Sequence, residues 1–305
     1  MGVVNSLTDG HRAGFACFVG RPNVGKSTLM NALVGSKVAI TSSKPQTTRR
    51  VIRGVVHRPD AQLVIVDTPG LHRPRTLLGE RLDSLVLSTL TEVDVIGFCV
   101  PAGDPIGRGD RFIAEKLAGL RKTPVVAVVT KTDLAPRDRV AEQLLEVSRL
   151  GEWADIVPVS AADGENLDTL TDVLVERLPE GPALYAGGEL TDEPEQVMVA
   201  ELIREAVLEG VREELPHSIA VVVEEMNPRE GKDILDIYAI MYVERPSQKA
   251  IVIGNKGARL KEVGTNARKQ IEALLGTRVF LDLRIKVAKD WQRDPKQLRR
   301  LGFYD

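Results

Sequence analysis

The sequence contains one complete phosphate-binding motif, and this motif restricts the possible folds more than any other feature. Residues 20–27 read Gly-Arg-Pro-Asn-Val-Gly-Lys-Ser and match G-x-x-x-x-G-K-[ST] at every position. The apolar run Phe15–Val19 precedes the motif, and the helical pattern Lys26–Val34 follows it. A glycine-rich turn between a buried strand and a helix N-terminus directs backbone N–H groups at phosphates. We therefore predict a P-loop nucleotide site, because a chance glycine-rich turn would not need these two flanks.

Apolar runs and helical patterns alternate from Ala13 to about Leu178, and the apolar runs have the near-continuous hydrophobicity of strands covered on both faces. The predicted strands are Phe15–Val19, Arg49–His57, Leu63–Val66, Val93–Val100, Val125–Val129 and Asp155–Val159. The predicted helices are Lys26–Val34, Leu78–Leu90, Asp110–Leu120, Arg137–Leu150 and Asn166–Arg177. This alternation predicts an α/β fold with a mixed, mostly parallel six-stranded sheet. The connection at residues 58–61 is too short for a helical crossover, so the strands beside it should pair antiparallel.

The pattern changes after residue 179, where residues 180–195 are rich in proline, glycine and acidic residues. We interpret this stretch as a linker. Beyond it we expect, in order, a helix at 197–211, strands at 218–225, 233–243 and 249–253, a helix at 258–275 and a strand at 278–287. We predict an N-terminal tail at 1–12, a nucleotide-binding domain at 13–179, a linker at 180–195 and an α+β domain at 196–305.

Cysteine usage and hydropathy exclude several classes of protein. Cys17 and Cys99 each lie within an apolar run, and two distant cysteines provide neither a disulfide framework nor the paired spacing of a zinc site. We expect two buried thiols. No run approaches the ~18 apolar residues of a membrane span. The first residues carry no basic stretch before an apolar core, so we expect no signal peptide.

Two motifs beyond the P-loop predict contacts to the phosphates and the metal. Residues 67–70, Asp-Thr-Pro-Gly, close a predicted strand, where Asp67 would support Mg²⁺ and the Gly70 N–H would meet a γ-phosphate. The polar loop at 41–49 should close on Mg²⁺ through a threonine, and we favour Thr48 over Thr47. Lys26 would reach the β- and γ-phosphates, and Ser27 would ligate Mg²⁺. The predicted metal ligands are Ser27, Thr48 and Asp67.

The third motif predicts the choice of base. Residues 130–133, Thr-Lys-Thr-Asp, follow a strand where GTPases usually carry N-K-x-D. The two acceptor oxygens of Asp133 match the N1–H and exocyclic amine of guanine, a donor pair that adenine lacks, so the site should select GTP over ATP. Lys131 would lay its alkyl stem along the base. Thr130 replaces the usual asparagine, and we expect weaker nucleotide affinity without loss of specificity.

A further pair, Ser160-Ala161, resembles the loop whose backbone meets the guanine carbonyl oxygen. The predicted nucleotide contacts are Gly20, Arg21, Pro22, Asn23, Val24, Gly25, Lys26, Ser27, Thr28, Asp67, Thr68, Pro69, Gly70, Leu71, Thr130, Lys131, Thr132, Asp133, Ser160 and Ala161.

The motifs also predict how hydrolysis is assisted. Many GTPases place glutamine directly after D-x-x-G to orient water, but this position is Leu71, which cannot hydrogen-bond. Intrinsic hydrolysis should therefore be slow, or the missing group should come from elsewhere. Asn23 stands where a subgroup of GTPases uses asparagine to ligate K⁺, and a cation there would neutralise developing charge. The predicted catalytic residues are Asn23, Lys26, Thr48 and Gly70.

Charge is distributed unevenly beyond the linker. Residues 196–244 carry eleven acidic and four basic residues, net −7, whereas residues 245–300 carry five acidic and fifteen basic residues, net +10. Such asymmetry is typical of a surface that meets a polyanion. Residues 251–257 place G-x-x-G after an apolar run and before a basic helix, the pattern of a KH RNA-binding module. The predicted RNA-binding residues are Gly254, Asn255, Lys256, Gly257, Arg259 and Lys261.

Together these motifs resemble those of the Era GTPases, bacterial assembly factors of the small ribosomal subunit. The resemblance covers most of the chain and rests on residues 20–29, 44–49, 67–70 and 251–257. It implies a Ras-like P-loop GTPase domain joined to a type II KH domain, with GTP or GDP and Mg²⁺ as ligands. It implies binding to the 3′ end of small-subunit ribosomal RNA, coupled to the nucleotide state, and a role in 30S subunit assembly. It also implies a cytoplasmic protein, in some cases at the inner face of the cell membrane.

We expect a monomer. Two alternatives stay open at this point. The basic segment would equally suit a GTPase that docks on a membrane surface or on a protein partner, and the P-loop alone would suit a housekeeping NTPase.

Overall fold

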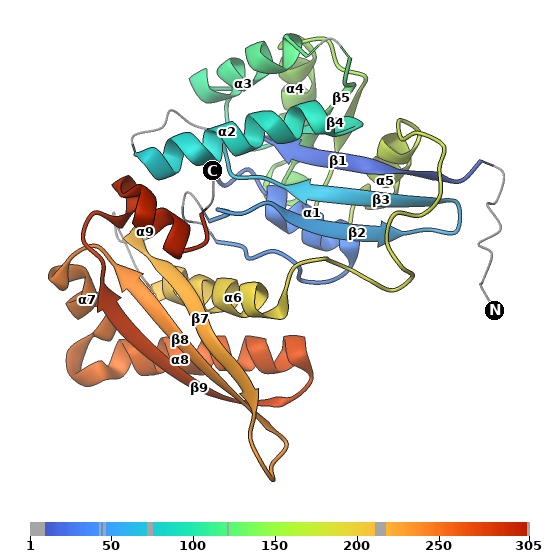
Figure 1. Cartoon of the computed structure of the whole chain (residues 1–305). Helices are drawn as coiled ribbons and strands as arrows, with labels where there is room; N and C mark the ends of the chain where they lie inside the picture. The colour runs from blue at the N-terminus through green and yellow to red at the C-terminus, as the bar shows by residue number, and fades with distance from the viewer. Residues whose placement is uncertain are drawn as a thin grey trace, which may run out of the picture. The chain divides into compact units, whose positions relative to one another are not determined.

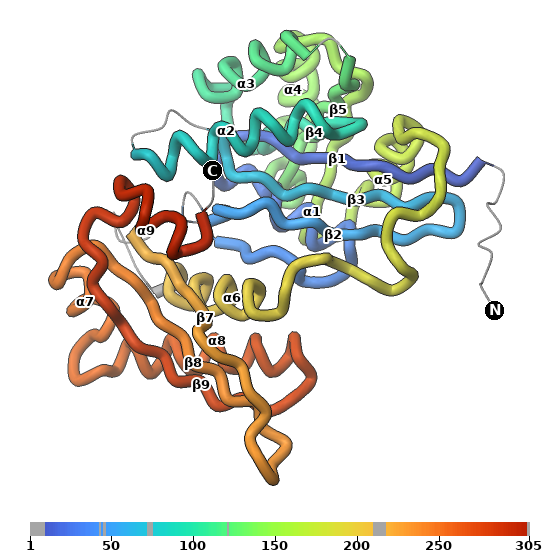
Figure 2. The backbone as a smooth tube through the Cα atoms, in the orientation of Figure 1, coloured from blue at the N-terminus to red at the C-terminus, as the bar shows by residue number. Residues whose placement is uncertain are grey.

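The computed structural model describes residues 10–42, 44, 47–71, 76–120, 122–210 and 218–303. The chain divides into two compact units (Figures 1 and 2). The first holds most of residues 10–192, and the second holds residues from 193 onward together with the described parts of 40–47 and 73–81. Pro45 and Gln46, from one motif of the family resemblance, lie outside the described residues, as do residues 1–9 of the predicted tail.

The first unit is built on a six-stranded sheet in the order β2-β3-β1-β4-β5-β6. Its strands are β1 (Arg12–Val19), β2 (Ile52–His57), β3 (Ala61–Asp67), β4 (Val95–Pro101), β5 (Val125–Thr130) and β6 (Asp155–Pro158). Only β2 runs antiparallel to its neighbour, and the other pairs are parallel. The predicted α/β fold is confirmed, and so is the antiparallel pairing of the two strands that residues 58–61 connect.

Helices cover both faces of this sheet. They are α1 (Lys26–Val34), α2 (Leu77–Glu92), α3 (Arg108–Ala118), α4 (Arg137–Ser148) and α5 (Leu167–Val175), with a short 3₁₀ turn, η1, at Thr132–Leu134. Ala16 and Phe18 of β1 share one apolar core with α1 and α5, while Cys17 and Val19 share the other with α2, α3 and α4. Because side chains alternate across a strand, continuous hydrophobicity is what two covered faces require.

The second unit is a three-stranded sheet packed against helices (Figure 1). In chain order its elements are α6 (Glu195–Gly210), β7 (Ala220–Pro228), β8 (Ile234–Val243), α7 (Pro246–Ile253), α8 (Ala258–Leu275) and β9 (Arg278–Val287). Strand β8 lies centrally, antiparallel to β7 and parallel to β9. A 3₁₀ turn, η4 (Trp291–Arg293), and helix α9 (Pro295–Arg300) follow, and neither is among the elements predicted above.

One predicted element has the wrong type, because the strand expected at 249–253 is the second half of helix α7. Gln248 Oε1 accepts the backbone N–H of Arg245 at 2.9 Å and so caps the N-terminus of the helix. The proline at its first position lacks an N–H that the helix would leave unpaired in any case. Gly254, at a left-handed φ of 71°, ends the helix. Five mainly apolar residues are too few to separate a strand from a buried helix by periodicity.

The segment predicted as a linker is hydrogen-bonded to the first unit over much of its length. The buried Gln62 of β3 accepts the N–H groups of Leu184 and Tyr185 through Oε1, at 2.6 and 2.8 Å. Farther along, the Val55 N–H of β2 donates to Leu190 O at 2.9 Å. Residues 184–190 therefore lie along the β2 and β3 side of the sheet.

Both cysteines are buried and unpaired by disulfide, as predicted. Burial raises the pKa of the Cys99 thiol to about 12, so this thiol stays protonated at neutral pH and reacts poorly.

Gly97 of β4 gives a test of the packing in the first unit. A Cβ at this position would lie 2.4 Å from Phe18 Cδ1, and Phe18 is fully buried. We expect Gly97→Ala to destabilise the chain by about 1–3 kcal/mol through overpacking. Urea unfolding would measure this as a lower midpoint with an unchanged slope.

The matched control is Gly187→Ala, where an added Cβ meets no atom within 4 Å. A Gly97→Ala midpoint no lower than that of the control would contradict the packing described here.

Candidate functional site

The P-loop connects β1 to α1 and its backbone is fixed by close contacts. Gly25 and Asn23 adopt left-handed φ angles of 100° and 66°, which glycine and asparagine adopt more readily than other residues. A Cβ at Gly20 would lie 2.6 Å from Cys99 O, so only glycine allows the loop to pass this close to β4. The Val24 side chain is buried beneath the loop.

Lys26, the first residue of α1, is almost completely buried. Its ammonium donates to Gly20 O at 3.4 Å and to Arg21 O at 3.3 Å, two long hydrogen bonds. Burial lowers the pKa of Lys26, and the carboxylate of Asp67 partly offsets this effect. A buried ammonium with only long backbone acceptors is a suitable partner for an anion such as a phosphate.

Three oxygen-bearing side chains meet beside Lys26. Ser27 Oγ donates to Asp67 Oδ2 at 2.7 Å, Thr48 Oγ1 donates to the same oxygen at 3.1 Å, and the two hydroxyl oxygens lie 3.1 Å apart. Asp67 is 1% exposed, and burial raises its pKa. Its other oxygen, Oδ1, is buried without a hydrogen-bond partner. We call Ser27, Thr48 and Asp67 the oxygen cluster.

The oxygen cluster fits Mg²⁺. Hydroxyl and carboxylate oxygens are the donors that this hard cation prefers, and a cation would satisfy the unpartnered Oδ1. Among the described residues, no group of three or more His, Cys, Asp or Glu side chains gathers into a metal site. A single carboxylate suits Mg²⁺ held jointly with a phosphate, as in nucleotide sites. Thr47, the less favoured candidate for the metal-binding threonine, does not join the oxygen cluster. Its hydroxyl donates to Lys44 O at 2.6 Å.

Residues 67–70 turn away from β3 directly above the P-loop. Thr68 Oγ1 donates to Phe18 O at 3.0 Å and so ties the turn to β1, while the adjacent Pro69 is buried. A Cβ at Gly70 would lie 2.9 Å from Pro22 N, so Gly70 packs on the P-loop backbone. Leu71 is 4% exposed and belongs to the apolar core, so its side chain cannot orient a water molecule.

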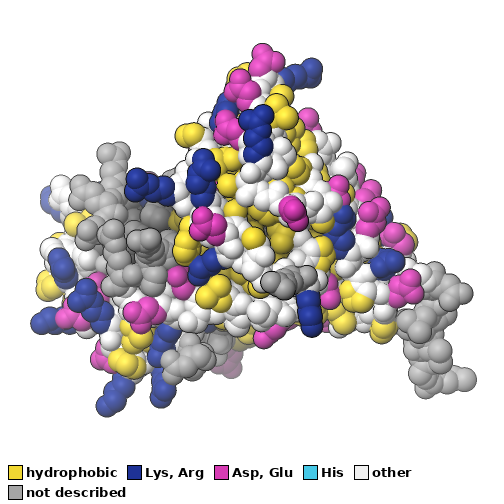
Figure 3. Space-filling model, turned by 90° about the horizontal axis from the view of Figure 1, so that it is seen from above, with side chains coloured by type: hydrophobic (Ala, Val, Ile, Leu, Met, Phe, Trp, Pro, Cys, Tyr) yellow, Lys and Arg dark blue, Asp and Glu magenta, His cyan; other side chains and the backbone are white. Residues whose placement is uncertain are grey.

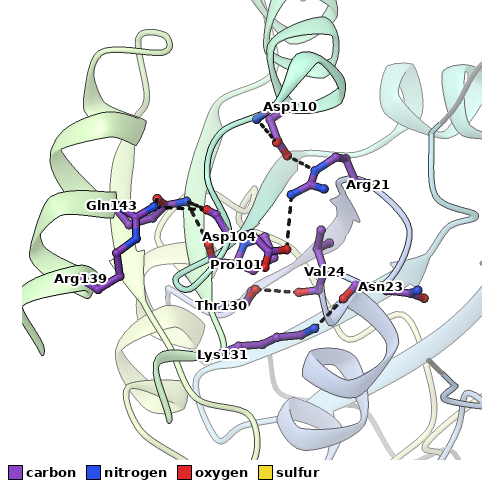
Figure 4. A network of polar contacts seen from close by, with 11 residues as sticks. Arg21, Asn23, Val24, Pro101, Asp104, Asp110, Thr130, Lys131, Arg139 and Gln143 are labelled. Atoms are coloured by element: carbon purple, nitrogen blue, oxygen red, sulfur yellow. Dashed lines mark hydrogen bonds and ion pairs between the residues drawn. The ribbon is translucent and has the colours of Figure 1, made fainter. Parts of the chain in front are cut away.

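The two residues that begin the base-recognition motif hold the P-loop from the other side (Figure 4). Thr130 Oγ1 donates to Val24 O at 2.6 Å, and Lys131 Nζ donates to Asn23 O at 2.7 Å. The threonine hydroxyl therefore supplies a link between motif and P-loop although it replaces the usual asparagine.

Asp133 is exposed at η1, where a ligand can reach it. Its Oδ1 accepts the hydroxyl of the fully buried Ser160 at 2.8 Å, and Ser160 Oγ also accepts the Asp163 N–H at 3.1 Å. Thr132 donates its hydroxyl to Glu165 Oε2 at 3.0 Å. Ser160 thus orients the carboxylate, a role that the serine's position after the last strand did not reveal.

Three other residues predicted to contact the nucleotide, Thr28, Ala161 and Arg21, have surroundings that differ from one another. Thr28 is exposed in the first turn of α1, and Ala161 is half-buried next to Ser160 in the chain. Arg21 points toward the start of α3, where its Nε donates to Asp110 Oδ1 at 2.7 Å (Figure 4). Sequence reasoning missed Asp110, because no motif marks an aspartate near a helix start as the partner of a residue 89 positions away.

In the second unit, residues 254–257 form a tight turn between α7 and α8. Gly254, Lys256 and Gly257 have positive φ angles of 71°, 49° and 81°, and Asn255 and Lys256 are exposed. Arg259 Nη1 donates to Ile251 O at 2.9 Å, so this arginine closes the end of α7. Lys261 is exposed one turn into α8. The turn presents its backbone and one cation to solvent.

One face of the first unit carries charge of both signs. Figure 3 looks down from the side of α3 and shows basic and acidic side chains interspersed on that face. That face therefore lacks the concentrated positive field that attracts a polyanion.

Comparisons with known proteins agree with this geometry. A family model described as a 50S ribosome-binding GTPase matches residues 15–131, and a KH domain model matches residues 214–292. GTPase Era of Streptomyces coelicolor is 70% identical over 302 residues, covering 96% of this chain and 95% of that protein. GTPase Era of a Mycobacterium species, strain KMS, is 67% identical over 295 residues, covering 96% of this chain and 99% of that protein.

Two solved structures have the same fold over nearly the whole chain. A variant of Aquifex aeolicus Era bound to GDP and AlF4⁻ superposes with a TM-score of 0.92 at 38% identity, covering 96% of this chain and 100% of that one. An Era structure in complex with MgGDPNP and nucleotides 1506–1542 of 16S ribosomal RNA superposes with a TM-score of 0.93 at 38% identity, covering 97% and 100%. The first unit is thus a Ras-like G domain, the second contains a KH domain, and this chain belongs to the Era family of GTPases.

Proposed function

We propose that this chain is a guanine-nucleotide switch that binds the 3′ part of small-subunit ribosomal RNA and assists assembly of the 30S subunit. The observation that carries the nucleotide half is the oxygen cluster beside the buried Lys26, with Asp133 exposed at the neighbouring loop. The solved Era complex that contains MgGDPNP and a 16S ribosomal RNA segment supports the RNA half. We assign the nucleotide to residues 13–179 and the RNA to residues 196–305.

Within the nucleotide site, the P-loop N–H groups and Lys26 would hold the phosphates. Asp133 and Lys131 would bind the guanine, and Ser160 would keep the Asp133 carboxylate oriented. Ser27, Thr48 and the unpartnered Oδ1 of Asp67 would hold Mg²⁺, while Asp67 Oδ2 accepts both hydroxyls. When bound, Mg²⁺ neutralises charge on the phosphate oxygens during hydrolysis. The Gly70 N–H would meet the γ-phosphate and so distinguish GTP from GDP.

Two further properties belong to the proposal. We infer a monomer as the working form. Attachment to the inner face of a membrane stays an expectation from the family resemblance, which flotation with anionic vesicles would test. Among the described residues, no helix has the length and hydrophobicity needed to cross a membrane.

The choice of base can be tested at Asp133. An amide at this position presents one acceptor and one donor, so Asp133→Asn leaves one guanine donor facing another donor. We expect GTP affinity to fall about 100-fold or more, and affinity for xanthosine triphosphate, which carries a carbonyl in place of the amine, to rise. Titration with fluorescent nucleotides measures both.

Asp138→Asn is the matched control, because Asp138 is an exposed carboxylate five residues away. Asp133→Asn protein that keeps the parent's GTP affinity would remove Asp133 from the base site.

Hydrolysis should depend on the monovalent cation. With Leu71 buried in the core, we propose that K⁺ held by Asn23 stabilises the developing charge. We expect GTP hydrolysis to be about tenfold faster, or more, in potassium than in sodium salts. Asn23→Gly, which tolerates the left-handed φ of this position, should abolish the difference. Equal rates of the parent chain in both salts would sink this proposal.

The RNA site can be tested at Lys256, an exposed cation in the 254–257 turn. Lys256→Asp places a carboxylate against the RNA backbone while aspartate tolerates the positive φ. We expect affinity for single-stranded RNA carrying the 3′ end of small-subunit rRNA to fall about tenfold or more. Filter binding with GDP and with a non-hydrolysable GTP analogue measures this loss, and the parent should bind more tightly with the analogue.

The control is Lys122→Asp, which makes the same charge change at an exposed position of the first unit. Equal losses in the two variants would indicate a general charge effect and remove the turn from the RNA site. Equal affinity of the parent with GDP and analogue would remove the switch.

A further inference from the structure

Arg21 lies inside the phosphate-binding motif, yet its guanidinium points toward α3 (Figure 4). Its Nε donates to Asp110 Oδ1 at 2.7 Å, and its Nη2 lies 3.6 Å from Asp104 Oδ2. The Asp110 side chain is 0% exposed, whereas the Asp104 side chain is 60% exposed. Because water and salt screen exposed ion pairs strongly, Asp110 is the partner that fixes Arg21.

Asp110 is itself held in one orientation. Its second oxygen, Oδ2, accepts the N–H of Gly107, the residue that precedes α3, at 2.9 Å. A Cβ at Gly109 would lie 2.8 Å from Arg21 Cδ, so the arginine stem packs directly on the first turn of α3. Removal of the Arg21 charge would leave the fully buried Asp110 carboxylate poorly compensated, whereas the Arg21 side chain itself is 30% exposed.

The loop between β4 and α3 is anchored from its other side by α4. The fully buried Gln143 donates through Nε2 to Pro101 O at 2.9 Å and to Asp104 O at 3.0 Å. Arg139 Nη2 donates to Gln143 Oε1 at 2.7 Å (Figure 4). Asp110 therefore belongs to a braced loop and helix start rather than to a free surface.

Pro22, the residue after Arg21, packs against Gly70 in the turn at residues 67–70. A Cβ at Gly70 would lie 2.9 Å from Pro22 N and 3.1 Å from Pro22 Cα. Pro22 N is bonded to the carbonyl carbon of Arg21, so any shift of the Arg21 backbone moves the surface on which Gly70 packs.

We propose that Arg21 is a positioning residue, which uses the buried Asp110 to hold Pro22 against Gly70 and so sets the place of the γ-phosphate donor. This inference rests on the proposed function, in which the Gly70 N–H meets the γ-phosphate. Arg21 then acts through the backbone and does not contact the phosphates. Its loss should weaken binding of a triphosphate more than binding of a diphosphate, because GDP has no γ-phosphate.

A double-mutant cycle with Arg21→Gln and Asp110→Asn tests this in the full chain. Affinities for GDP and for a non-hydrolysable GTP analogue are measured with Mg²⁺ present, together with kcat for GTP. We expect each single variant to lose about five- to tenfold in analogue affinity and less than about twofold in GDP affinity. The double variant should lose no more analogue affinity than whichever single variant binds the analogue less tightly. Either substitution alone already removes the link between Arg21 and Asp110.

Gly109→Ala retains both charges and presses on Arg21 Cδ, so it should reproduce the loss even if a charge variant folds poorly. Arg58→Gln is the matched control, since Arg58 pairs with Asp60 at 3.0 Å in the β2–β3 turn and should leave both affinities unchanged. Thermal unfolding of each variant reports whether it is folded.

Additive losses in the double variant would overturn the proposal. The proposal would also be overturned if Arg21→Gln lost GDP and analogue affinity equally while Asp110→Asn changed neither affinity. That result is expected if the Arg21 side chain contacts the phosphates directly. A parent chain that binds neither nucleotide would refute the proposed function and this inference with it. A parent that binds both, with a silent cycle, would refute the inference alone.

Discussion

The nucleotide site depends on one buried carboxylate, Asp67, at the end of β3. Placing an ionised group among buried strands is costly unless hydrogen bonds or a cation compensate it. Ser27 and Thr48 supply two hydrogen bonds to a single oxygen, and the other oxygen has no partner. The raised pKa of Asp67 expresses the remaining cost. Because Ser27 lies in the first turn of α1 and Thr48 precedes β2, the same carboxylate brings together the ends of three separate segments.

The P-loop is held by bonds to its backbone carbonyls as well as by its sequence. Lys26 donates to the carbonyl groups of residues 20 and 21. Lys131 donates to the carbonyl group of residue 23, and Thr130 to that of residue 24. Carbonyl groups held in this way leave the N–H groups of the loop free to face an anion. Thr130 can perform this part of the usual asparagine's task with one hydroxyl, whereas an amide has both a donor and an acceptor to offer. Weaker nucleotide affinity therefore remains a prediction.

Much of the fold follows from local rules, while the unpredicted contacts join residues distant in sequence. Helices α1 and α8 and strand β9 lie at the predicted residues. The two helices end where predicted because glycines at positions 35 and 276 stop them in left-handed conformations. Helix α7 was misassigned because its N-terminal cap depends on the Gln248 side chain rather than on periodicity. The predicted motif residues Ser27, Thr48 and Asp67 do meet. Ser160 was predicted as a nucleotide contact, but its support of Asp133 was not, and Asp110 was not predicted at all, since their partners are 27 and 89 positions away.

The stretch at 184–190 has a consequence for how the G domain can exist alone. Strand β2 is at the edge of the six-stranded sheet, and its Val55 N–H is occupied by Leu190 O. His57 Nε2 lies 2.7 Å from Glu189 O, and Arg53 pairs with Asp192 at 3.0 Å. An exposed edge strand is a template for pairing with another chain. A fragment ending at residue 179 would uncover this edge, whereas one ending after residue 192 would carry its own protective cover against aggregation.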